Sequence, residues 1–533
     1  MNKALNITIA LFKNSLRNTG ERKGYMSNLM GIFISGLVFG VMFVFFTLQS
    51  GPIMHLLGLT AEFLAMVFFA AQIVVLLFGT ILMVSAMFFS KDAEFLLSLP
   101  VPSATVFLAK LLYVYISELV LSGFMVLTSG VTYGIVCGFG PLYYILLIPA
   151  ILLVPMIPLV LSSLISIPLV FVISFFKNKG ALTVIILIAL FGVGMYYYFK
   201  FFSNIGGSDG MAFPLEEYSR AIGYLLPDIA LARIVTLTSE GYASDVLMVL
   251  LFSAGLLAVS TLVSIFTYKR GVSAQLEQTK VSSSGKIEYT ENSVLKTLIV
   301  KDAKEIIGNP GLAFYCLFQL VIAPIIIVFY NSMFFKSMPE GADPWVGFSI
   351  SVIMLFLLVI GMNYTALTTI SREGKNFHIM KSLPLPLSVH LKAKLILADA
   401  ITLAGIVISI ATMLILIPQL IIDIALFFLF CVIFGIGYNR FLVFIDAKYP
   451  KLDWENIVMA LKNSRNSFIS MGVCMLIGVV FFTGYLLINI LAIDKVLFFT
   501  LFWAFFLILA IALNYFFTRL LYNNFEKLVN QIE

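Results

Sequence analysis

Two stretches of the chain carry the same charged, proline-containing pattern, and they are its strongest candidates for binding chemistry. Residues 91–110 read KDAEFLLSLPVPSATVFLAK, and residues 375–394 read KNFHIMKSLPLPLSVHLKAK. At a constant separation of 284 residues, seven positions are identical: Lys91/Lys375, Ser98/Ser382, Leu99/Leu383, Pro100/Pro384, Pro102/Pro386, Ala109/Ala393 and Lys110/Lys394. The prolines interrupt a helix and favour extended backbone before them. Apolar residues held beside charges in such a loop are typical of a contact with a protein partner.

Motifs for nucleotide, metal and redox chemistry are missing from the sequence. No GxxxxGK[ST] and no GxGxxG pattern occurs, and the Ser-Gly-Lys at 284–286 lacks the glycine and the Ser/Thr of a phosphate loop. His55, His378 and His390 are far apart, and none of the four cysteines forms a CxxC pair. We therefore expect no catalytic residue, no metal and no cofactor on this chain.

Three carboxylates lie within long apolar stretches, where a charge costs a few kcal/mol and invites a functional interpretation. Glu118 lies about two turns into one stretch, Asp399 about one turn into another, and Asp423 near the end of a third. Glu118 and Asp399 follow Lys110 and Lys394 by similar intervals. The alternative is therefore that both acids are paired or hydrated near a membrane surface.

The composition indicates a membrane protein. Of 533 residues, 61% are hydrophobic and 11% are charged, and the mean hydropathy is +1.06. A transmembrane helix needs about 20 apolar residues. Twelve stretches meet this need, near 29–48, 64–89, 111–136, 143–174, 181–202, 246–268, 312–332, 347–370, 395–416, 419–441, 467–490 and 495–520. The expected fold is all-α and polytopic, with about twelve transmembrane helices in two homologous six-helix halves.

The distribution of basic residues predicts the orientation of these spans. With both termini in the cytoplasm, 28 of the 33 Lys and Arg residues fall on cytoplasmic segments. The exceptions are Lys200, Arg220, Arg233, Lys336 and Lys495. The excess of positive charge thus indicates topology and contact with membrane lipid, and not nucleic acid. The expected location is the cell membrane.

Each half begins with an amphipathic helix that we expect to lie on the membrane surface. In the first half, residues 1–268, this helix covers 4–17, and in the second half, residues 294–533, it covers 294–307. Between the halves, the polar and Ser-rich segment 269–293 predicts a flexible cytoplasmic linker.

The repeated loop resembles the loop between the second and third spans of type-2 ABC transporter permeases. The segments SREGK at 371–375 and YPKLDWEN at 449–456 accompany it. The combination is similar to large Gram-positive bacterial ABC exporter membrane subunits that carry two six-span halves in one chain. The resemblance implies a permease that forms the path for an amphipathic or lipidic substrate, while two copies of a separate cytoplasmic ATPase bind and hydrolyse ATP.

The resemblance also implies that loops 91–103 and 375–388 insert into the ATPase subunits. The coupling residues it implies are Lys91, Asp92, Glu94, Leu99, Pro100, Pro102, Lys110, Lys375, Asn376, His378, Leu383, Pro384, Pro386 and Lys394. Asn376 and His378 stand where the first loop has Asp92 and Glu94, so the two loops differ in charge. The alternatives are a secondary carrier with two six-span repeats and a membrane-embedded lipid or glycan enzyme.

Overall fold

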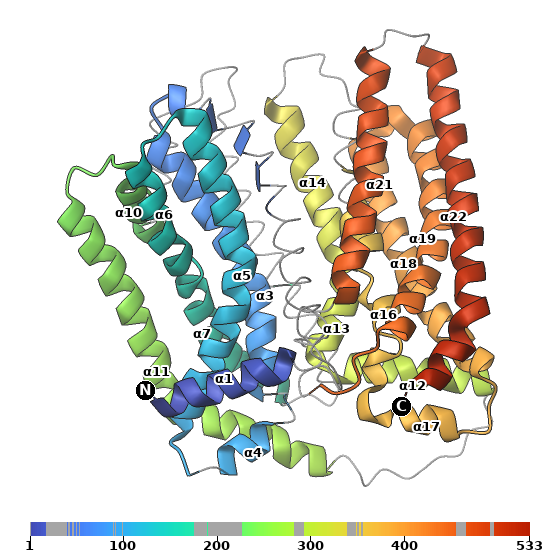
Figure 1. Cartoon of the computed structure of the whole chain (residues 1–533), viewed down its shortest axis with the longest axis horizontal. Coiled ribbons are helices and arrows are strands. Elements are labelled where there is room, and N and C mark those ends of the chain that lie inside the picture. The colour runs from blue at the N-terminus through green and yellow to red at the C-terminus, as the bar shows by residue number, and fades with distance from the viewer. Residues whose placement is uncertain are drawn as a thin grey trace. The chain divides into compact units, whose positions relative to one another are not determined.

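A computed structural model describes most of the chain as helices. The described residues are 2–16, 54–88, 92–98, 100–174, 226–281, 293–337, 355–454, 465–490 and 495–532, with isolated residues at 40–52, 90, 189, 348, 351 and 352. Within these ranges there is no β-strand. The elements fall into two compact units, α1–α11 and α12–α22, with the boundary near residue 286 (Figure 1). Each unit is described by itself.

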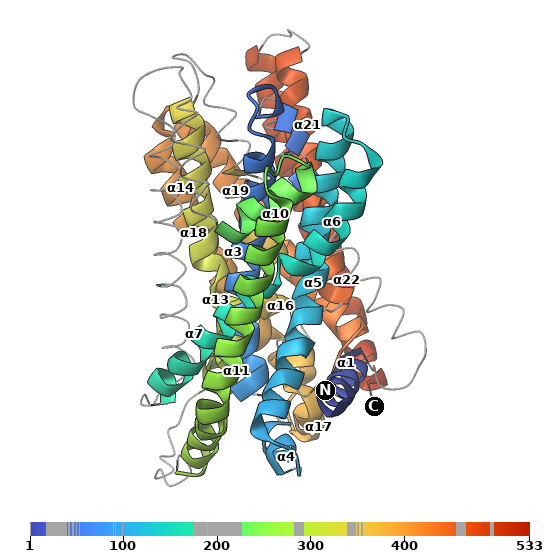
Figure 2. The same ribbon diagram turned by 90° about the vertical axis from the view of Figure 1, so that its left-hand side faces the viewer.

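Unit 1 is a bundle of long apolar helices with short helices at its ends. Its elements are α1 (Asn2–Leu16), α3 (Thr60–Phe88), α4 (Ala93–Ser98), α5 (Ser103–Cys137), α6 (Pro141–Leu153), α7 (Met156–Ser174), α10 (Leu226–Thr236) and α11 (Tyr242–Val281). The long helix α3 packs against α5, α7 and α10, and α1 lies across α5. Both views place α1 and α4 near the lower end of this unit (Figures 1 and 2).

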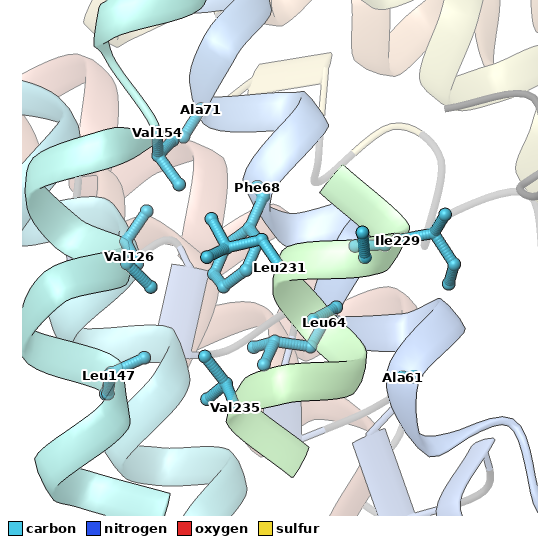
Figure 3. Packing of buried hydrophobic residues seen from close by; sticks show 14 of the residues in the cluster. Ala61, Leu64, Phe68, Ala71, Val126, Leu147, Val154, Ile229, Leu231 and Val235 are labelled. Carbon is cyan, nitrogen blue, oxygen red and sulfur yellow. The ribbon is translucent and has the colours of Figure 1, made fainter. Parts of the chain in front are cut away.

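The core of unit 1 forms where α10 packs against α3 and α6. Ile229, Leu231 and Val235 of α10 are buried together with Leu64 and Phe68 of α3 (Figure 3). Burying one such side chain stabilises the fold by about 1.5–3 kcal/mol. In this core, Gln72 Nε2 of α3 donates to Asp228 Oδ1 of α10 at 2.7 Å.

Unit 2 is also a helix bundle, but two of its helices are interrupted. Its elements are α12 (Val294–Gly308), α13 (Pro310–Leu317), α14 (Gln319–Ser337), the π-helix η2 (Phe356–Gly361), α16 (Tyr364–Leu367), the 3₁₀-helix η3 (Ser371–Asn376), α17 (Phe377–Ser382), α18 (Leu387–Leu416), η4 (Pro418–Leu420), α19 (Ile421–Lys448), α21 (Arg465–Ile490) and α22 (Lys495–Gln531). The central helix α19 packs against α18 and α22, and α18 packs against α12 and α14.

Seven described helices are long and apolar enough to cross a membrane. They cover Thr60–Phe88, Ser103–Cys137, Pro141–Leu169, Tyr242–Val263, Leu387–Leu416, Pro418–Lys448 and Thr500–Gln531. The pair Gly311–Leu317 and Gln319–Val328, bent by 47°, would make an eighth. The predicted helical fold is therefore confirmed, whereas the layout of twelve helices in two halves is not. The predicted spans 181–202 and 29–48 lie almost wholly outside the described residues.

One local prediction differs from the structure. Residues 269–281 continue helix α11, so the first half of the expected flexible linker is helical, and 282–292 lie outside the described residues. Residues 226–236 form helix α10, whose apolar residues complete the core of unit 1 with α3 and α6.

The two short helices α4 and α17 lie at equivalent positions of the sequence repeat. Residues 93–98 and 377–382 form them, and the following long helices begin at 103 and 387, in each case 284 residues apart. Ser98 Oγ donates to the carbonyl oxygen of Phe95 at 2.7 Å, and Ser382 Oγ donates to that of Ile379 at 2.9 Å. The shared serine therefore makes the same bond in each copy. Pro102 and Pro386, both with extended backbone, precede the long helices.

Candidate functional site: a charged junction in unit 2

The chain turns sharply between the apolar helix that ends at η2 and the short helix α17. Asn363 leaves the helical conformation, and its side-chain Oδ1 caps α16 by accepting from the backbone N–H of Thr365 at 3.2 Å. Gly374 has φ +55°, which a residue with a Cβ rarely adopts. A Cβ there would also lie 2.9 Å from the Trp454 ring. The turn therefore depends on a glycine at 374.

A buried carboxylate of α19 holds this turn. Asp446 Oδ2 accepts from the backbone N–H groups of Ile370 at 2.6 Å and Ser371 at 3.0 Å. Ser371 Oγ donates to Asp446 Oδ1 and accepts from the Lys451 backbone N–H at 3.0 Å. Trp454 Nε1 donates to the Ser371 carbonyl oxygen at 2.8 Å. The SREGK segment at 371–375 is therefore in contact with residues 449–454 of the YPKLDWEN segment.

Next to this turn, six charged side chains from three elements form what we call the charged junction. It comprises Lys301, Asp302 and Glu305 of α12, Arg372 and Glu373 of η3, and Lys394 of α18. The shortest contacts bring Glu373 within 2.7 Å of both Lys301 Nζ and Lys394 Nζ. Lys394 is also 3.5 Å from Asp302, and its ammonium donates to the Thr369 carbonyl oxygen at 2.9 Å.

The junction stabilises the ionised form of one carboxyl group most strongly. Burial would raise the pKa of Glu373, but Lys394 and Lys301 outweigh burial and lower this pKa to about 2. Glu305 behaves differently, because burial raises its pKa and Arg372 opposes that rise only in part. Glu373 is therefore the anion around which the cations of the junction are arranged.

The three acids of the junction could in principle form a metal site, since ligand oxygens of Asp302, Glu305 and Glu373 lie within 4.8 Å of one another. Three cations face these three acids, so the charge is already balanced. Lys394 and Lys301 also take up oxygens of Glu373 that a metal would need. We therefore interpret the cluster as an ion-pair network that fastens α12 to the turn and to α18.

Unit 1 places the equivalent lysine in a simpler arrangement. Lys110 is 1% exposed, and its Nζ donates to the Ala86 carbonyl oxygen at 2.8 Å, Ser90 Oγ at 2.7 Å and Asp92 Oδ1 at 3.1 Å. Thr8 of α1 donates to the Ala109 carbonyl oxygen at 3.0 Å. In both units, therefore, the repeated lysine near the start of a long helix binds a backbone carbonyl near the end of the preceding helical segment. An amphipathic helix packs against the same long helix, α1 on α5 and α12 on α18.

The other predicted loop residues are divided between buried and exposed positions. Exposed residues of the two loops are Pro100, Pro102, Lys375, Asn376, His378, Leu383, Pro384 and Pro386. Lys91 and Leu99 lie outside the described residues, as does the side chain of Glu94. Lys110 and Lys394 are buried.

The three acids within apolar helices have separate surroundings. Glu118 is fully buried where α5 faces Gly79 of α3. Asp423 accepts from Trp503 Nε1 at 3.1 Å. Asp399 does not use the lysine before it: Arg440 Nη1 lies 3.2 Å from each of its carboxylate oxygens. Asp399 is therefore paired with Arg440, whereas Lys394 contacts Glu373.

Sequence reasoning missed the residues that complete these networks. Asp302, Glu373 and Asp446 come from distant parts of the sequence, and no local pattern joins them. Arg440 could have been found, because it is an arginine at the end of an apolar stretch and the nearby Asp399 needed a cation.

The described part of the chain is thus that of a helical protein with long apolar helices, in which each unit has a buried lysine ion pair near the start of a long helix. A protein family described as "Putative ATP-binding cassette" matches residues 22–525. The chain belongs to this family. No curated protein and no solved structure matches the chain.

The family match corrects several predictions. Its description names the ATP-binding component, so it overturns the resemblance to permease subunits and the function of forming a path for an amphipathic or lipidic substrate. The expectations that the chain is not an enzyme and carries no cofactor, with ATP on a separate subunit, were also wrong by this finding. The alternatives of a secondary carrier or a lipid or glycan enzyme have no support from it.

Proposed function

We propose that this chain is a membrane-embedded ATP-binding cassette protein that binds ATP and works with partner subunits of a transport system. The family match over 22–525 is the single observation that carries the assignment. It covers both units, so the assignment applies to the helical bundles themselves. Neither a strand among the described residues nor a GxxxxGK[ST] motif in the sequence marks the nucleotide site, so ATP binding needs a direct test.

A location in the cell membrane is supported by the seven long apolar helices. The ends that carry α4 and α17 face the cytoplasm in this proposal, because most Lys and Arg residues fall on that side and positively charged loops stay inside. Both termini then lie in the cytoplasm.

Contact with partner subunits is assigned to the two short helices and the loops that follow them. On α4, Phe95 is 65% exposed, and on the second copy Ile379 and Leu383 are exposed as well. Charged or polar residues are neighbours of each apolar group in the sequence, and the repeated lysines bind Asp92 and Glu373, which precede the two groups. Large apolar side chains in such a setting are typical of a protein interface.

The test of ATP binding uses the full chain, purified in detergent with lipid and free of other ATPases. We expect a fluorescent ATP analogue to bind in the presence of Mg²⁺, to be displaced by ATP, and to be hydrolysed by the chain alone. The control is the same preparation after heat denaturation. Absence of saturable binding at millimolar MgATP would refute the assignment of ATP to this chain and would return ATP to another subunit.

Contact between the two loops and partner subunits is tested separately, by placing a charge among the exposed apolar residues of each loop. Phe95→Asp and Leu383→Asp should lower the amount of partner transport subunits that co-purify, as identified by mass spectrometry, because an unpaired charge at a desolvated contact is costly. Ser388→Asp, at an exposed position outside these apolar residues, is the matched control. Equal recovery of partner subunits with all three variants would exclude these loops as docking points.

A further inference from the structure

An ion pair lies between α18 and α19, near the ends of the apolar stretches predicted at 395–416 and 419–441. Asp399 comes twelve residues after the start of α18, and Arg440 comes eight residues before the end of α19. At about 1.5 Å per residue, they lie about 18 and 12 Å from the same end of the two antiparallel helices. Their side chains are 19% and 17% exposed, so the pair is partly open to the surroundings of the bundle.

One edge of the Arg440 guanidinium has no acceptor in the described part of the chain. Nη1 donates to Asp399 and to the carbonyl oxygen of Ile436, whereas Nε and Nη2 donate to nothing among these residues. A guanidinium presents five N–H donors in a planar fork that fits phosphate. Unsatisfied donors of a charged group beside an apolar phase are costly, so a ligand with acceptor oxygens would stabilise this edge.

The carboxylate of the pair is held in a fixed orientation by a buried polar network. Asn439 Nδ2 donates to Asp399 Oδ1 at 2.8 Å, and Asn363 Nδ2 donates to Asn439 Oδ1 at 2.7 Å. Thr402 Oγ1 accepts from Asn363 at 2.7 Å and from Asn439 at 3.0 Å. These bonds connect the partly exposed pair to the helix break at Asn363. Asn439 thus restricts the orientation of the Asp399 carboxylate.

Apolar side chains are also exposed on the same two helices. They lie beyond the ion pair as counted from the end of α18 that carries Lys394. Val407 of α18 and Leu429 of α19 are exposed, and helical spacing places them on the same sides of their helices as Asp399 and Arg440. A molecule with a charged head at the ion pair and hydrocarbon chains along these residues would match both parts of the surface. A bilayer phospholipid has this form, and lipid is the medium that apolar helices of this length contact.

We propose that Asp399 and Arg440 form a binding site for a phospholipid whose headgroup carries both a phosphate and a primary ammonium. The phosphate accepts from Nε and Nη2 of Arg440, and the ammonium donates to Asp399. The ion pair is neutral as a whole, so it complements a zwitterionic headgroup better than an anionic one. A choline headgroup lacks the N–H donors that Asp399 can accept. The site does not depend on ATP binding by the chain.

Native mass spectrometry of the delipidated full chain tests the proposal. Phosphatidylethanolamine, phosphatidylcholine and phosphatidylglycerol with identical acyl chains are added in turn. We expect phosphatidylethanolamine to bind most tightly. Arg440→Gln should weaken its binding about tenfold, the loss expected for a charge-assisted phosphate contact. Asp399→Asn should remove the preference over phosphatidylcholine. Lys392→Gln, which removes an exposed cation of α18, is the matched control and should change neither property.

Loss of one charge can disturb folding, so the double variant Asp399→Asn/Arg440→Gln supplies a second measurement. It removes both charges, leaves no unpaired ion between the helices, and should bind the three lipids equally. Three outcomes would overturn the proposal: equal binding of the three lipids by the unaltered chain, a preference that survives in the double variant, or the same loss in Lys392→Gln.

Discussion

Replacement of Lys394 by methionine should destabilise unit 2 strongly, although the residue lies away from the apolar core. Lys394 is 3% exposed, and its ammonium lies 2.7 Å from Glu373, 3.5 Å from Asp302 and 2.9 Å from the Thr369 carbonyl oxygen. Methionine keeps much of the length of the aliphatic stem and removes these three contacts together. The junction would then hold three acids and two cations.

The size of the effect follows from what is left unpaired. Removal of one partner from a buried ion pair costs about 3–5 kcal/mol, because the remaining charge stays buried. Glu373 retains Lys301 at 2.7 Å, so we expect the lower end of this range, about 3 kcal/mol. Glu373→Gln in the same chain should relieve part of the loss, with a coupling energy of about 1.5–3 kcal/mol.

Reversible unfolding in mixed micelles, followed by helical circular dichroism, would measure these free energies. Lys392→Met is the control, since it removes an exposed lysine two residues earlier on the same helix and should cost less than about 0.5 kcal/mol. If Lys394→Met and Lys392→Met differ by less than about 1 kcal/mol, the charged junction does not hold unit 2 together, and the reasoning from burial is wrong.

Three further changes test the turn and its charges. Because the pKa of Glu373 is lowered to about 2 from 4.5, its ionised form should stabilise the fold above pH 4.5, and this contribution should be lost between pH 4.5 and 2. Glu373→Gln should remove this pH dependence of the free energy of unfolding, as measured by acid unfolding. Burial lowers the pKa of Lys451 to about 8 from 10.5, so the free energy of unfolding should rise between pH 8 and 10.5, and Lys451→Met should flatten this rise in the same assay. Gly374→Ala should lower thermal stability by an amount equivalent to about 1–3 kcal/mol, because residue 374 has φ +55° and its Cβ would meet Trp454. Gly308→Ala is the control, since a Cβ at 308 meets open space. Equal melting temperatures of the two variants would contradict the strain at 374.

Much of the local structure could be predicted from short-range patterns. Helices expected at 4–17 and 294–307 occur as Asn2–Leu16 and Val294–Gly308, because their apolar residues recur at helical spacing. The prolines of the repeated loop end α4 and α17 as proline chemistry requires. The same loop also suggested a permease subunit, and the family match corrected that assignment. A short loop specifies a local shape, whereas the family match draws on residues 22–525.

By itself, the sequence determined that this chain is helical, very apolar and internally repeated, because hydropathy and periodicity are properties of neighbouring residues. Only the tertiary structure decided which charges meet. Lys394 could have paired with Asp399 by its position in the sequence, but the fold turns it to Glu373 and gives Asp399 to Arg440. In an apolar bundle each charge needs a partner within a few ångströms, and that partner comes from whichever element the packing brings beside it. Pairing is therefore set by the contacts among α12, η3, α18 and α19, which no local pattern encodes.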